Sequence, residues 1–107
     1  MALYHYLGED IVEGGTLVLD ISWYDDAGAS VTPDTATWTL REDKSGQVVN
    51  SRKDVEISSL DTTNTLVLTG DDLVRGRLKL YLSATYTSAN GSDLPLKSII
   101  SFVVQGF

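Results

Sequence analysis

The fold is decided by residues 35–49, which read T-A-T-W-T-L-R-E-D-K-S-G-Q-V-V. Apolar Ala36, Trp38 and Leu40 alternate with polar side chains, as in a strand with one buried and one solvated face. Gly46 follows in a polar stretch, and because glycine takes positive φ at little cost, it predicts a hairpin loop before the chain resumes as Q-V-V. A buried Trp covers about 200 Å². The stretch therefore predicts a small sandwich assembled around Trp38.

The same alternation predicts further strands on both sides of this hairpin. Apolar residues recur at every second position, which is the pattern of a half-buried strand. The predicted strands cover residues 3–7 with a possible continuation at 11–12, and then 16–24, 55–57, 64–69, 77–87 and 94–105. From their inward faces we expect a core that includes Trp23, Trp38, Leu80 and Phe102.

Turn-forming residues separate these strands. Asp71 and Gly76 are typical of the first and last positions of a short helical turn, which we expect near 71–75. That turn would carry the chain across one end of the sandwich, from one sheet to the other. Asn90 and Gly91 predict a tight turn in which both residues are left-handed.

These elements predict the fold class. Short strands, frequent turn signals and the lack of a 3.6-residue apolar period indicate an all-β domain spanning residues 1–107. We expect an antiparallel two-sheet sandwich of about seven or eight strands, with a small closed barrel as the alternative. A parallel sheet is disfavoured because no crossover of a dozen helical residues is present.

Composition limits the partners and the place of folding. The chain has no cysteine, which excludes disulfides and thiolate chemistry. Its formal charge of -7 repels phosphate backbones and anionic lipid, so nucleic acid and membranes are not expected partners. The first residues lack the basic and apolar regions of a signal peptide, and no apolar run is long enough to span a bilayer. We expect a soluble protein that folds in the cytoplasm.

No catalytic constellation is evident, and we expect no enzymatic activity and no cofactor. His5 is the only histidine, and neither G-x-S-x-G nor S-x-x-K occurs. The acidic pairs 25–26 and 71–72 are explained by turn capping. Calcium binding is the alternative for these pairs, because hard cations take carboxylate oxygens.

The aromatic residues are a better indication of binding. Tyrosine suits interfaces because its ring packs while its hydroxyl stays hydrated. The candidate partner-binding residues are Tyr4, His5, Tyr6, Tyr24 and Tyr81. Residues 1–13 are interpreted as an edge strand of the domain, or alternatively as an arm that attaches to a neighbouring subunit. A second hypothesis is a carbohydrate-binding accessory domain, in which Tyr24, Tyr81 or Trp23 would stack on sugar rings.

Five segments together carry a family resemblance. They are G-G-T-L-V-L-D-I-S-W-Y-D-D-A-G, T-A-T-W-T-L-R, K-S-G-Q-V-V, N-T-L-V-L-T-G-D-D-L and L-P-L-K-S-I-I-S-F-V-V. From about residue 14 to residue 104 the chain resembles the small immunoglobulin-like sandwich proteins of tailed-phage virions. The resemblance implies a structural accessory that docks on capsid, neck or tail subunits, is located in the virion, and is able to form homo-oligomers.

Overall fold

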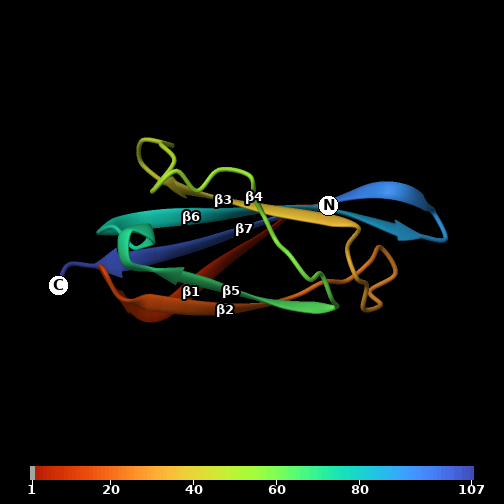
Figure 1. Ribbon diagram of the computed structural model, residues 1–107, viewed down its shortest axis with the longest axis horizontal. Coiled ribbons are helices and arrows are strands. Elements are labelled where there is room, and N and C mark those ends of the chain that lie inside the picture. Colours follow the sequence, from red (N-terminus) through yellow and green to blue (C-terminus); the bar gives the residue numbers. More distant parts are fainter. Residues whose placement is uncertain (1) are drawn as a thin grey trace.

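The computed structural model describes residues 2–107, with side chains described from Asp10 onward, as a chain built almost entirely of strands (Figure 1). The prediction of an all-β chain is confirmed. The elements in order are β1 (Ala2–Val12), β2 (Thr16–Ser22), β3 (Thr35–Glu42), β4 (Val55–Glu56), β5 (Thr63–Thr69), the 3-10 turn η1 (Gly70–Asp72), β6 (Gly76–Ser88) and β7 (Gly91–Gln105).

The strands form two layers of unequal size (Figure 1). The larger sheet has five strands in the order β1-β7-β6-β3-β4, and the smaller sheet pairs only β2 with β5. The molecule is elongated, at 48 × 23 × 22 Å, because the β6–β7 hairpin projects beyond the smaller sheet at one end (Figure 1).

The expectation of a purely antiparallel sandwich is wrong for β1. This strand runs parallel to β7, with Ala2 opposite Lys97 and Val12 opposite Gln105. A parallel pair needs a crossover connection, but that connection does not have to be a helix. Here the crossover connection is the sequence from β2 to β6, which passes through both sheets before the chain returns as β7. The larger sheet is therefore mixed.

The core lies between the two layers, where the inward faces of the strands meet. In β5, residues alternate strictly between exposed and buried, and in β6 the buried set starts at Leu78 and recurs every second residue. This is the side-chain period of a strand with one solvated face. The completely buried apolar side chains include Leu40, Leu68, Leu78, Leu80 and Phe102.

Both tryptophans are buried, but in separate clusters. Trp38 belongs to the main cluster and is 6 % exposed. Trp23 is 2 % exposed and packs in a smaller cluster with Ala36 and Ala84. The centre of the main cluster is thus made mostly of leucines, with Trp38 as one member.

After β3 the chain makes two consecutive turns rather than the simple hairpin that was expected. Gly46 has φ of 72°, as predicted, but the returning segment forms only a single bridge between Arg41 and Val48. A second turn follows at once, in which the N–H of Arg52 donates to the carbonyl of Val49 at 3.0 Å.

Leu40 fixes both ends of this second turn. Its N–H donates to the carbonyl of Arg52, and its own carbonyl accepts the N–H of Val49, both at 2.9 Å. The two central residues, Asn50 and Ser51, have φ of 52° and 56°. Positive φ at both central positions is the geometry of a type I′ turn.

Two predicted turns differ in detail. The helical turn expected near 71–75 is a 3-10 turn over Gly70–Asp72, and the carboxylate of Asp72 caps its start by accepting the N–H of Thr69. It does connect β5 in one sheet to β6 in the other. At the tip of the β6–β7 hairpin, Gly91 and Asp93 have positive φ, whereas Asn90 does not, so its predicted left-handed conformation is wrong.

Candidate functional site

Two of the residues predicted to bind a partner, Tyr24 and Tyr81, lie in different parts of the fold. Tyr24, which follows β2, is 53 % exposed and bridges to Ser30. Tyr81 lies in β6 of the larger sheet and is half-buried. The two tyrosines therefore belong to different layers and do not form a common binding surface.

Tyr4, His5 and Tyr6 lie in β1, at the edge of the larger sheet. In the register with β7 they stand opposite Ile99, Ile100 and Ser101. Their side chains lie outside the described part of the structure. Because the backbone of this segment pairs within its own domain, the alternative of a free attachment arm does not describe the structure.

Trp23 cannot serve as a sugar platform. Its ring is buried, and its indole N–H donates to the side-chain oxygen of Asn64 at 2.9 Å. Stacking on a sugar requires an exposed ring face, so this part of the carbohydrate hypothesis is wrong.

A depression of about 330 Å³ lies on the outer face of the larger sheet. Its lining includes Tyr81 together with hydroxyl and cationic side chains, among them Thr37, Thr39, Arg41, Ser83 and Lys97. The cations already have partners within the chain. Lys97 donates to Ser83 Oγ at 2.7 Å, and Arg41 donates to the Gly46 carbonyl at 2.9 Å. This surface can offer hydroxyls and one aromatic ring to a polar ligand.

The outer face of the smaller sheet has a different chemistry. Val18 and Val67 are directly opposite each other in the β2–β5 register, and their exposures are 57 % and 51 %. They are the exposed large hydrophobic pair at the centre of this face. The surrounding cross-strand pairs are polar and mutually bonded: Thr16 with Thr69 at 3.2 Å, Thr65 with Asp20 at 2.7 Å, and Ser22 with Thr63 at 3.1 Å.

We call this surface the β2–β5 face. Its apolar centre and its hydroxyl rim resemble the usual organisation of a small protein interface. The alternation in each strand places Val18 and Val67 outward, but only the register shows that they form a pair.

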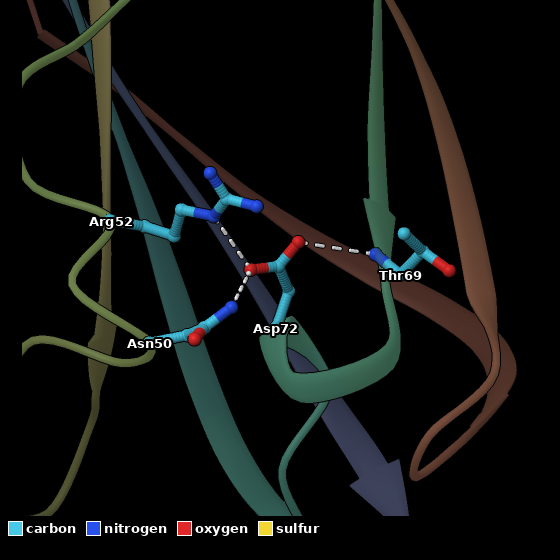
Figure 2. Close-up of polar contacts among 4 residues, drawn as sticks. All are labelled: Asn50, Arg52, Thr69 and Asp72. Atoms are coloured by element: carbon cyan, nitrogen blue, oxygen red, sulfur yellow. Dashed lines mark hydrogen bonds and ion pairs between the residues drawn. The ribbon is translucent and has the colours of Figure 1, made fainter.

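A buried carboxylate, missed from the sequence, joins the long loop after β3 to η1 (Figure 2). Asp72 is 1 % exposed, and its Oδ1 accepts hydrogen bonds from Asn50 Nδ2 and Arg52 Nε, both at 2.8 Å. Its Oδ2 accepts the N–H of Thr69 at 3.2 Å. Arg52 in turn lies over the ring of Trp38, at 5.8 Å from the centroid. We call these residues the Asp72 clasp.

The charge of Asp72 is stabilised by its partners. Burial on its own raises the pKa of this carboxyl, but the hydrogen bonds from Arg52, Asn50 and Thr69 outweigh it, so the pKa is lowered from 3.8. The clasp is thus ionised at neutral pH. Its geometry holds two segments of chain together, and both carboxylate oxygens accept hydrogen bonds from within the chain.

The other acidic pair also caps a turn. Asp25 Oδ1 accepts the N–H groups of Ala27 and Ala29, each at 2.9 Å. Asp26 accepts a hydrogen bond from Asn90, which is the leading cause of its lowered pKa. Among the residues whose side chains are described, no three His, Cys, Asp or Glu side chains come close enough together to hold a metal ion.

No helix in residues 2–107 has the length and apolarity required to cross a membrane. Comparisons with protein-family models, with curated proteins and with solved structures found no match to this chain.

Proposed function

We propose that this chain is a non-enzymatic interaction module, an immunoglobulin-like sandwich that docks on a symmetric assembly. The assembly we propose is a tailed-phage particle, with the protein as a capsid decoration, neck or tail accessory. The single observation that carries the docking role is the exposed Val18–Val67 pair at the centre of the β2–β5 face. The phage setting rests on the sequence resemblance alone.

The energetics favour an assembly with many copies. Burying one valine completely contributes about 1.5–3 kcal/mol, and these two side chains are already about half covered. A single contact of this size is weak, so each copy would bind weakly on its own. A symmetric particle repeats the same contact at every equivalent position, and each bound copy stabilises the assembled state by mass action.

The test is retention of the purified protein on particles that lack it, measured by co-sedimentation. We expect the double variant Val18→Thr/Val67→Thr to lose most of its retention, because threonine keeps the β-branched shape and removes the apolar contact. The matched control is Val48→Thr, a half-buried valine in the loop after β3, on the other layer. Equal retention of wild type and the double variant would exclude this face as the docking surface.

If no component of the particle retains the wild-type protein, the docking function itself is wrong. Retention of wild type at defined sites, seen by electron microscopy of the particles, would identify the capsid, neck or tail position. The number of occupied sites per particle would also show whether the same contact is repeated at symmetry-equivalent positions.

One observation keeps the carbohydrate alternative open. Tyr81 lines the depression on the larger sheet with several hydroxyl groups around it, and an aromatic ring with polar neighbours suits a sugar. Calorimetric titration with oligosaccharides tests this second function. Tyr81→Ala should abolish binding, whereas Tyr24→Ala, on the other layer, should not; binding that survives Tyr81→Ala would reject the depression as the site.

A further inference from the structure

The geometry points to the free edge of β5 as an acceptor for an extended segment of a partner protein, one with an uncharged centre and basic residues at both ends. This inference rests on the proposed docking function and specifies how the partner is held. Among the strands of residues 2–107, β5 pairs with β2 alone, so the opposite side of β5 has no hydrogen-bonded partner strand there. An open edge is a ready template for another strand.

The two sheets have four edges, and the other three carry protective features. β4 is only two residues long. β1 contains Glu9 and Asp10, and its register shifts between Leu7 and Ile11. β2 contains the exposed Asp20. Short strands, irregular register and charged residues are the devices that keep edges from pairing with other chains.

β5 has none of these devices. Its seven residues, T-N-T-L-V-L-T, include no charge and no proline, and its pairing with β2 is regular throughout. Thr and Val are favoured in strands. Charged residues make up 21 % of the chain, but β5 has none. Its edge therefore lacks this protection against pairing with another strand.

The phase of the β2–β5 ladder shows which backbone groups are available. Trp23 N–H donates to the Thr62 carbonyl, and Gly70 N–H donates to the Gly15 carbonyl. In an antiparallel pair these hydrogen-bonded positions alternate. The backbone groups of Thr63, Thr65 and Val67 therefore point away from β2, toward the free edge.

The next position on this side of β5, Thr69, already has a hydrogen-bond acceptor within the chain. The N–H of Thr69 donates to Asp72 in the clasp, at 3.2 Å. The acceptor edge is thus limited to the backbone of Thr63, Thr65 and Val67, which matches an incoming strand of about five to seven residues.

The charges at the ends of the edge select the occupant. Exposed Asp61 precedes β5, and exposed Asp71 follows it in η1. A second copy of this chain fits poorly, because antiparallel pairing centred on Leu66 would bring Asp61 of one copy toward Asp71 of the other. Both copies also carry a formal charge of -7. A segment with Lys or Arg at both ends is complementary to these carboxylates.

The probe is a fluorescein-labelled synthetic peptide, K-K-T-V-T-V-T-K-K, titrated against the full chain by fluorescence anisotropy. The control peptide, E-E-T-V-T-V-T-E-E, keeps the centre and reverses the charge at both ends. We expect the glutamate peptide to bind at least about tenfold more weakly than the lysine peptide. Equal binding of both peptides, or no binding of the lysine peptide, would overturn the inference.

A proline variant locates the binding. Thr65→Pro removes an N–H that points to the β5 edge, so it does not break the ladder between β2 and β5. We expect Thr65→Pro to abolish binding of the lysine peptide. An unchanged affinity of this variant would exclude the β5 edge as the site.

A measurement on the wild-type chain avoids dependence on how the variants fold. Addition of the lysine peptide should slow amide hydrogen exchange at Thr63, Thr65 and Val67, and should leave Val18 unchanged. Absence of protection at these three amides would reject the site. Particle retention that survives Thr65→Pro but not Val18→Thr/Val67→Thr would support docking by the β2–β5 face and reject the strand-addition mode alone.

Discussion

The indole N–H of Trp23 donates a hydrogen bond to Asn64 Oδ1 at 2.9 Å, and both side chains are buried. The same oxygen accepts the N–H of Asp61 at 3.2 Å, while Asn64 Nδ2 donates to the Ser59 carbonyl at 3.1 Å. Asn64 therefore ties the smaller cluster to the chain that leads into β5. Its buried amide has partners on both its donor and its acceptor side.

Replacing Asn64 should test how much this arrangement stabilises the fold. Asn64→Leu leaves the Trp23 N–H buried without a partner, and we expect a loss of about 1–3 kcal/mol in the free energy of unfolding. Urea unfolding followed by tryptophan fluorescence measures it. Asn64→Asp keeps the acceptor oxygen and should cost less; an Asn64→Leu variant as stable as wild type would show that the indole finds another partner.

The Asp72 clasp predicts a specific loss of stability in acid. Because the pKa of Asp72 is lowered from 3.8 in the folded state, its contribution is present above about pH 4 and is lost as the pH falls through the folded pKa. We expect Asp72→Asn to be less stable than wild type at pH 7 by about 1–3 kcal/mol.

The difference between the two proteins should become smaller below pH 4, since wild type then also carries a neutral group at this position. Denaturant unfolding between pH 2.5 and pH 7, read by circular dichroism, provides the comparison. The exposed Asp71, mutated to Asn, is the adjacent control and should show no comparable effect. A constant difference between wild type and Asp72→Asn at all pH values would contradict the assignment.

Ser51→Gly should stabilise the protein. Ser51 has φ of 56° in the type I′ turn, where a side chain is strained by about 1–2 kcal/mol, and glycine is the preferred residue. The greater freedom of glycine in the unfolded chain offsets part of this gain, so we expect a net increase of about 0.5–1 kcal/mol. Ser58→Gly, in a loop position without positive φ, should be neutral or destabilising; equal effects of the two variants would be inconsistent with relief of strain.

Thr39→Val should destabilise the loop that follows β3. Thr39 is 8 % exposed, and its hydroxyl accepts the N–H of Asp54 at 2.9 Å. Valine has the same shape but cannot accept this bond, so we expect a loss of about 1–2 kcal/mol. Thr37→Val is the matched control two residues earlier on the same face, and thermal unfolding of both variants should separate the hydroxyl from the change in shape.

The strands were predictable because their side chains alternate. The inward positions of β6 and the burial of Trp38 follow from a period of two, which the residues carry locally. The passage from one sheet to the other after β5 was also predictable, since Asp and Gly residues mark a turn there.

Pairing across long separations was not predictable from the same pattern. Alternation does not state which strand lies beside β1, and the parallel partner is about 95 residues away. Polar residues at inward positions were also missed: Asn64 shares the inner face of β5 with Leu66 and Leu68, and the partners that satisfy it, Trp23 and Ser59, come from other segments.

The same limit applies to the candidate surfaces: the alternation within a strand was predictable, and the contacts between segments were not. The alternation within each strand places Val18 and Val67 outward, but their position opposite each other depends on the β2–β5 register. The clasp could not be expected, because Asn50, Arg52 and Asp72 are brought together only by the type I′ turn and η1.

The parallel pairing of β1 with β7 also determines how the domain carries mechanical load. Ala2 lies beside Lys97 and Gln105 lies beside Val12, so the start of β1 and the end of β7 are at opposite ends of the ladder. Tension applied to these two ends in opposite directions slides the strands lengthwise and strains all the hydrogen bonds between them at once. A domain held in this way resists stretching along its long axis far better than one whose terminal strands peel apart bond by bond.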